Sequence, residues 1–178
     1  MLPPAVSQLT EMLQTQYAAI VSIASAVNAV PPPPVMRGSA AIATVTGETK
    51  KYPARAAALV NGAISHALDY DDTHFAYVGH PSVAIFPAAL AAAEEVGASA
   101  GDVCQAFLLG AEASCLIGMI LGRRHYDAGF HQTATAGCFG ATVAVALIYG
   151  MERSALSAAL GLASTRASGL KSQFGTMG

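Results

Sequence analysis

The stretch VCQAFLLGAEASCLIGMILG, residues 103–122, decides the fold because it is apolar for about the length of a membrane span. Gln105 and Glu112 argue against a span, since a carboxylate in the middle of a lipid bilayer is costly. We therefore expect a buried helix of a helical domain. A small residue recurs on one face of this helix at every fourth position, at Gly110, Ser114, Gly118 and Gly122. Such a face lets a second helix approach closely.

The flanking sequence predicts further helices, and so an all-α helical bundle. We expect helices over about 54–69, from His80-Pro81-Ser82 onward, from a Ser99/Asp102 capping-box start to about Gly122, over 133–150 and over 152–163. Residues 40–52 alternate weakly around a Gly-Glu turn and favour a short hairpin. We set residues 1–39 apart as a divergent N-terminal helix (5–29) and a proline-rich linker, because the prolines at 31–34 end a helix.

Composition excludes several classes of function. Hydrophobic residues make up 53% of the 178 residues and the net charge is −2, with basic residues scattered, so we expect no nucleic-acid partner. Basic amphipathic segments are absent too, and we expect no membrane partner. The N-terminus lacks the pattern of a signal peptide, and three cysteines without metal-type spacing are typical of reduced core thiols. We therefore expect a cytoplasmic protein.

The run HALDYDDTHFAYVGHPS, residues 66–82, gathers three of the eleven acids and three of the five histidines in a chain with only 11% charged residues. Asp69, Asp71 and Asp72 cannot all ionise cheaply side by side without cations. A divalent metal site is one interpretation, but the run lacks DDxxD spacing and we expect no metal. Another is that one carboxylate orients a histidine while others cap nearby amides. A solvated turn is the third.

Two histidines precede predicted helix starts, in GHPS (79–82) and GFHQT (129–133), each beside a hydroxyl residue suited to an N-cap. Helix N-termini attract carboxylates and disfavour imidazolium. A neutral histidine there can accept a proton near neutral pH, as a general base must. If both helix starts face one pocket, they would bind a small polyanion and move its protons.

The stretches NGAISHALDYDDTH (61–74), GHPS, GFHQTATAGCFGAT (129–142) and ASGLKSQFGTMG (167–178), in that order, closely resemble the MmgE/PrpD family. This family includes 2-methylcitrate dehydratases, cis-aconitate decarboxylases and iminodisuccinate epimerases. The resemblance covers about residues 40–178, and residues before 40 match poorly. It implies a large helical domain with a smaller α+β lid, a homodimer and an active site without cofactor.

The resemblance also implies a substrate class and site residues. Substrates would be small di- or tricarboxylates, and the reactions share proton transfer at a carbon next to a carboxylate. Asp69, Thr73, His80 and His131 fall on positions associated with the site. We predict catalytic roles for His80, His131 and Asp69. The predicted substrate-binding residues are Thr73, Asp72 and Thr133.

One departure concerns the end of the sequence. In relatives the GTM segment is followed by a lysine of the site and then by the lid, whereas here Gly178 is the last residue, and Lys171 is a different lysine. We therefore expect an N-terminal part of a family member, without the lid, that turns over little substrate by itself. The alternative is a non-catalytic helical interaction module with a remnant site. The choice between dehydration, decarboxylation and epimerisation stays open.

Overall fold

The computed structural model describes residues 40–174, and it begins with the expected short hairpin. Strand β1 (Ala43–Thr44) pairs antiparallel with β2 (Lys51–Tyr52), with Ala43 opposite Tyr52. Gly47 adopts a positive φ of 86° in the connecting turn, a conformation that glycine reaches without strain. The hairpin prediction is confirmed. The helix and linker predicted for residues 1–39 lie outside the described residues.

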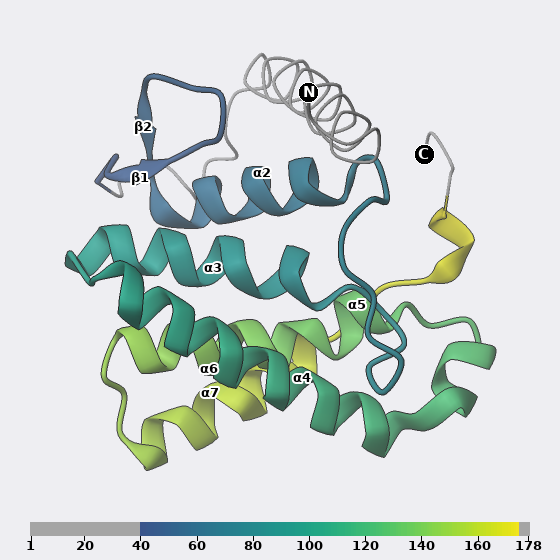
Figure 1. The fold of residues 1–178 in the computed structure, drawn as a ribbon. Coiled ribbons are helices and arrows are strands. Elements are labelled where there is room, and N and C mark those ends of the chain that lie inside the picture. The colour runs from purple at the N-terminus through teal and green to yellow at the C-terminus, as the bar shows by residue number, and fades with distance from the viewer. Residues whose placement is uncertain (1–39, 175–178) are drawn as a thin grey trace, which may run out of the picture.

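Helices make up most of the rest, as expected for a helical bundle (Figure 1). They are α2 (Ala54–His66), α3 (Pro81–Val96), α4 (Ala100–Asp127), α5 (Gln132–Thr135), α6 (Gly137–Ile148) and α7 (Arg153–Arg166), followed by a short 3₁₀ turn, η2 (Lys171–Gln173). Ser99 and Asp102 form the predicted capping box at the start of α4. The helix predicted over 133–150 is instead two helices, which meet at Ala136.

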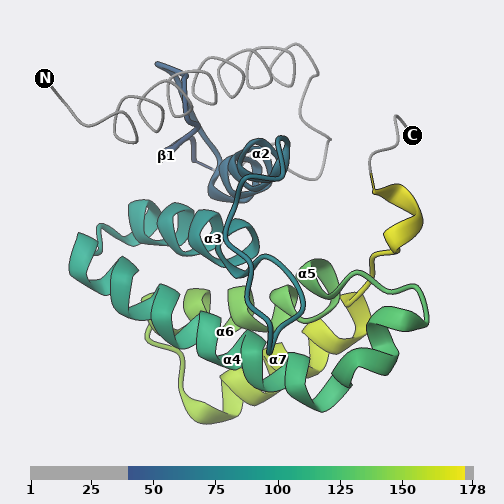
Figure 2. The same ribbon diagram turned by 45° about the vertical axis from the view of Figure 1, so that its right-hand side comes forward.

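The helices pack in layers around α3 and α6. Helix α2 lies on α3, α3 on α4 and α6, and α7 on the outer side of α6 (Figures 1 and 2). Much of the buried surface is alanine, which lets helix backbones approach closely. One core cluster lies beneath the hairpin and comprises Ala43, Val45, Ala54, Ala57, Ile64 and Ala91. A second, at the junction of α3, α4 and α6, comprises Ile85, Ala89, Ala93, Val103, Ala106 and Ala144.

The small-residue face of α4 packs against α6, as the sequence predicts. A Cβ added at Gly110 would lie 2.7 Å from the Gly140 carbonyl oxygen, and one added at Gly140 would collide with the Ser114 hydroxyl. Gly122 does not share this role. It adopts φ 66° and ψ 179°, which kinks α4 at the residue where we expected the helix to end.

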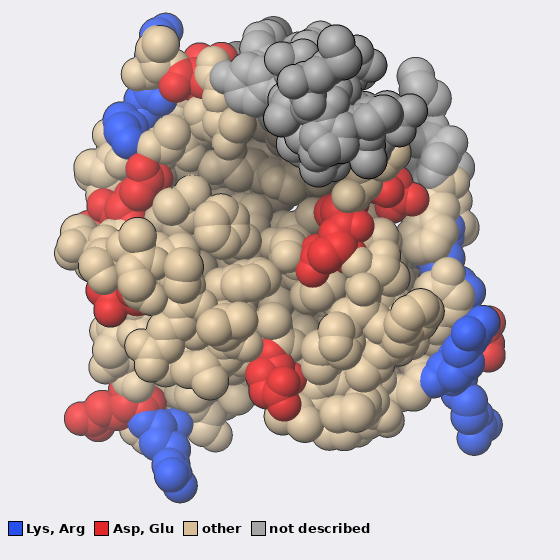
Figure 3. Space-filling model, viewed as in Figure 1, with Lys and Arg blue, Asp and Glu red and all other residues tan. Residues whose placement is uncertain are grey.

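The opposite face of α4 is apolar but exposed. Its exposed large side chains are Leu108, Leu109, Leu116, Met119 and Ile120. Glu112 is exposed among them, although we expected its helix to be buried. Lys and Arg appear only at the edge of this face of the molecule (Figure 3). Helix α4 is long and apolar enough to cross a membrane, although core helices of soluble proteins pass the same test, and 33% of its most apolar window is buried.

Candidate functional site

The segments that carry the predicted site residues lie at one end of the bundle, on the right of Figure 1. Three segments meet there: the loop 67–80 between α2 and α3, the turn 128–131 before α5, and the segment 167–174. The second and third are tied together, because the His131 amide donates to the Gly169 carbonyl (3.0 Å) and the Lys171 amide to the Gly129 carbonyl (2.9 Å). Residues distant in sequence thereby form one polar cluster.

Tyr77 anchors the loop 67–80 in the core. It is fully buried, and its hydroxyl donates to the Thr133 carbonyl oxygen at 2.8 Å. Its backbone lies against Gly118 and its hydroxyl against Gly137, where added Cβ atoms would be 2.8 and 2.6 Å away. Burial raises the pKa of the Tyr77 hydroxyl well above its usual range, so it stays a hydrogen-bond donor.

Thr133 then fixes the backbone of His80. Its hydroxyl accepts a hydrogen bond from the His80 amide at 3.0 Å. Gly79 allows this close approach, since a Cβ there would lie 2.8 Å from the Thr133 nitrogen and hydroxyl oxygen. The tie from Tyr77 through Thr133 to His80 joins the two loops that carry the two predicted catalytic histidines.

A buried carboxylate, that of Asp71, lies at the centre of the cluster. Its Oδ2 is 2.9 Å from His66 Nδ1 and 3.2 Å from His80 Nδ1, and only 7% of its side chain is exposed. On the other side of His80, Nε2 lies 3.5 Å from Asp69 Oδ1, whose side chain is 78% exposed. Asp69 itself adopts a positive φ of 55°, a conformation that Asp tolerates better than most residues.

His131 joins the cluster through His66. The two rings stack with centroids 5.8 Å apart, and the His66 ring is in turn 4.9 Å from that of His80. The edge of Phe174 also packs on His131, at 4.5 Å. Burial first, and then the neighbouring His66 and His80, lower the pKa of His131, although Asp69 and Asp71 partly oppose the shift. His131 is therefore a neutral imidazole at neutral pH, able to accept a proton.

The structure thus brings His80, His131 and Asp69 to one place, where their catalytic roles stay predictions. His80 is the N-cap of α3, a helix of 16 residues. His131 is the N-cap of α5, which has only four residues, so the helix-dipole argument applies to His80 far better than to His131.

The three predicted substrate-binding residues are placed differently from one another. Thr73 is exposed on the loop. Asp72 caps α3, because its Oδ1 accepts from the Ser82 amide at 3.1 Å. Thr133 is buried and holds His80. Substrate binding by these residues stays a prediction. His66 and Asp71 were not among the predicted site residues, because the sequence shows three acids within four positions without showing which of them is buried.

Four of these side chains could hold a metal ion. One ligand atom each from His66, Asp69, Asp71 and His80 lie within 4.8 Å of one another. Two imidazoles and two carboxylates suit zinc and related divalent cations. With bonds of about 2.0–2.1 Å, donor atoms on opposite sides of an ion are at most roughly 4.2 Å apart, so the cluster would have to contract slightly around it.

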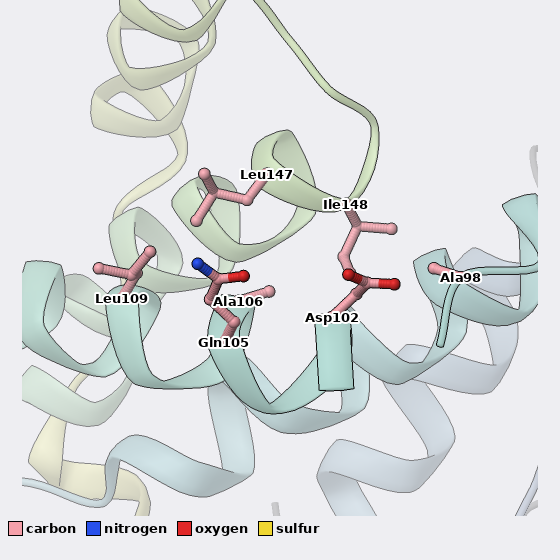
Figure 4. A pocket seen from close by; sticks show the side chains of 7 residues that line it. All are labelled: Ala98, Asp102, Gln105, Ala106, Leu109, Leu147 and Ile148. Atoms are coloured by element: carbon pink, nitrogen blue, oxygen red, sulfur yellow. The ribbon is translucent and has the colours of Figure 1, made fainter. Parts of the chain in front are cut away.

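A hollow between α4 and α6 offers no comparable chemistry (Figure 4). Five of its seven lining residues are apolar, and its one carboxylate, Asp102, is taken up by the capping box: Oδ2 accepts from the amide and the hydroxyl of Ser99. The histidine cluster is therefore the better candidate for a functional site.

The structure thus combines a mainly helical bundle with a cluster of carboxylates and imidazoles at one end. The chain belongs to the MmgE/PrpD family, since residues 10–178 match the MmgE/PrpD N-terminal domain. The match includes most of the segment 1–39 that we set apart. The chain is 33% identical over 140 residues to cis-aconitate decarboxylase of Aspergillus terreus and 30% identical over 135 residues to the cis-aconitate decarboxylase-like protein oryM of Aspergillus oryzae.

These alignments cover 75% and 71% of this chain but 29% and 28% of the two relatives. The chain therefore spans less than a third of the length of the curated relatives it matches.

Proposed function

We propose that this chain forms the helical part of an enzyme that moves a proton at a carbon next to a carboxylate of a small di- or tricarboxylate. Two relatives named for cis-aconitate decarboxylation support this substrate class. The observation that carries the proposal is the convergence of His66, His80 and His131, from three separate segments, around two aspartates. Such an arrangement supplies both proton donors and proton acceptors within one site.

The imidazoles have distinct surroundings, which favour distinct roles. His131 is neutral at neutral pH and accepts a proton from substrate carbon or from water. His80, 3.5 Å from Asp69, exchanges a proton with that exposed carboxylate or with bound substrate. Thr73, exposed on the loop between α2 and α3, offers a hydroxyl to a substrate carboxylate.

For decarboxylation the balance is simple. The bond to the departing carboxylate breaks and its electron pair passes into the conjugated system that remains. A protonated imidazole then delivers one proton to carbon and becomes neutral. Dehydration needs proton transfer in the opposite direction: a neutral imidazole first removes a proton from carbon, and hydroxide then leaves. A site that holds a neutral imidazole beside others that exchange protons suits either reaction.

Binding is tested by nuclear magnetic resonance of the histidine rings in the purified chain. Titration with cis-aconitate is expected to shift the ring signals of His66, His80 and His131, and to leave those of His74, which is exposed and bonded to Cys115. The uncharged trimethyl ester of cis-aconitate is the matched control ligand. Equal shifts at His74, or unchanged signals at all three site rings, would refute the proposed substrate class.

The products then identify the reaction. Release of carbon dioxide from cis-aconitate indicates a decarboxylase, and formation of the hydrated tricarboxylate indicates a dehydratase working in reverse. Because we expect this chain to turn over little substrate by itself, binding with little or no product agrees with the proposed part of an enzyme. Absence of both binding and product supports the second candidate function, a non-catalytic interaction module with a remnant site.

The exposed apolar face of α4 favours this second candidate. Leu108, Met119 and Ile120 are 66%, 55% and 80% exposed, a large apolar area for a surface helix. If the face serves association, size-exclusion chromatography with light scattering should show a dimer or a larger species. A monodisperse monomer would count against an interaction role and against the homodimer expected from the family resemblance.

A further inference from the structure

The Asp71 carboxylate is the one deeply buried acid of the cluster, and neither the family resemblance nor the proton-transfer proposal gives it a role. It comes from the loop 67–80 and lies beneath the rings of His66 and His80. Its Oδ1 is buried without a hydrogen-bond partner among the described residues. Buried polar atoms without partners are rare in folded proteins and call for a specific explanation.

The geometry constrains where the protons of the two rings lie. An ionised carboxylate only accepts hydrogen bonds. Because Asp71 Oδ2 lies 2.9 Å from His66 Nδ1, the proton of the neutral His66 ring is on Nδ1, and its Nε2 keeps a free lone pair. His80 Nδ1 faces the same oxygen at 3.2 Å but off the line of a hydrogen bond. The Nδ1 atoms of both rings therefore point toward the same carboxylate oxygen.

We propose that Asp71 is a positioning residue that fixes the Nδ1–H tautomer of His66, and thereby makes His66 the third proton-transferring imidazole of the site. This inference rests on the proposed function. His66 lies between His80 and His131, with ring centroids 4.9 and 5.8 Å away. With its Nδ1–H held by Asp71, the His66 ring accepts a proton at Nε2, becomes an imidazolium beside the Asp71 carboxylate, and returns that proton from the same Nε2 to a neutral neighbouring group. In the other tautomer Nε2 would carry a hydrogen and could not accept.

A purely structural role for Asp71 predicts something different. A structural carboxylate that ties a loop to a helix would be satisfied at both oxygens, as Glu94 is elsewhere in this molecule. Asp71 instead contacts imidazoles through one oxygen only. Holding a ring in one tautomer is the well-known task of a carboxylate paired with a histidine.

The test is the nitrogen spectrum of the histidine rings in the whole chain, recorded at a pH where the rings are neutral. In the unsubstituted protein His66 is expected to show the Nδ1–H tautomer alone. In Asp71→Ala it should change to a mixture dominated by the Nε2–H form that neutral histidine prefers in water. Asp69→Ala, which removes the exposed neighbouring carboxylate, is the matched control and should leave the His66 tautomer unchanged.

Two results would overturn the inference: an Nε2–H or mixed tautomer at His66 in the unsubstituted protein, or an Asp71→Ala spectrum identical to it. The first needs no variant, so it decides the question even if Asp71→Ala folds poorly. Tautomers are observed without substrate. Failure here is therefore distinguishable from failure of the proposed function, which is tested by titration with cis-aconitate.

Discussion

Two carboxylates at opposite ends of α3, the partly buried Glu94 within the helix and the buried Asp71 beside its start, have very different partners. Near the C-terminal end, Glu94 accepts hydrogen bonds from the amide of Thr44 (2.6 Å), from the Thr44 hydroxyl and from Lys51 Nζ (3.1 Å). At the N-terminal end, Asp71 contacts imidazoles through one oxygen, and its other oxygen has no hydrogen-bond partner among residues 40–174. Glu94 joins the hairpin to the bundle, whereas Asp71 joins histidines to each other.

The difference separates a structural network from the cluster that we propose to be functional. Burial alone would raise the pKa of Glu94, but the hydrogen bonds from Thr44 and Lys51 outweigh it and lower that pKa, so the network is complete within the chain. The Asp71 cluster is incomplete by the same standard. Incomplete buried polar groups are concentrated at functional sites, where a ligand or a moving proton supplies the missing partner.

The largest loss of stability is expected from a substitution in the uncharged contact between α4 and α6. It serves as a reference for the substitutions of Glu94 and Asp71. Gly140→Ala places a Cβ against the Ser114 hydroxyl and the Gly110 carbonyl oxygen, so α4 and α6 must move apart. We expect a loss of about 3 kcal/mol in the free energy of unfolding, measured with urea. Gly161→Ala is the matched control: its Cβ would meet open space within α7, and the substitution should stabilise by up to about 1 kcal/mol. Equal effects would contradict close packing at Gly140.

Glu94→Ala comes next and tests the complete network. It leaves the amide of the partly buried Thr44 without a partner and removes the ion pair with Lys51. We expect a loss of about 2 kcal/mol, again by urea unfolding. Glu112→Ala, which removes an exposed glutamate in the middle of α4, should change stability by less than about 0.5 kcal/mol. A Glu94 effect no larger than this control would mean that the hairpin is held by its apolar contacts alone.

Asp71→Asn tests whether Asp71 differs from Glu94 in its contribution to the free energy of unfolding. Because Asp71 contacts no lysine or arginine within residues 40–174, removing its charge relieves a desolvation cost while an amide oxygen can still accept from His66. We expect a loss below about 1 kcal/mol, or a gain. A loss equal to that of Glu94→Ala would make Asp71 a structural residue.

The smallest effect concerns pH. The pKa of His131 is lowered in the folded state from an ordinary value of 6.5, so between these two values the unfolded chain binds more protons than the folded chain. The stability from this group is therefore present above pH 6.5 and is lost as pH falls through the folded pKa. His131→Gln should make the fall in unfolding free energy between pH 7 and 5 shallower, while His74→Gln should not. An unchanged slope in His131→Gln would contradict the shift.

The sequence predicted the scaffold better than the site, for a physical reason. Capping residues, prolines and the small-residue face of α4 act locally or on one helix face, so the hairpin, the capping box and the α4–α6 contact were predictable. The break at Ala136 and the exposure of Glu112 depend on which faces neighbouring helices cover. At the site, His80 and His131 carried a local signal before helix starts. His66 and Asp71 stood out only as members of the run 66–82, because only the folded loop shows which acid turns inward.

The tyrosine at the base of that loop has a wider consequence. Tyr77 rests on two glycines of the bundle, Gly118 and Gly137, and through Thr133 its hydroxyl reaches the segment that holds His80. The imidazole geometry is thus inherited from interior packing. Substitutions at these two glycines would displace Tyr77 and thereby alter the proposed proton transfer from a distance. A survey of natural variants restricted to residues that line the site would overlook them.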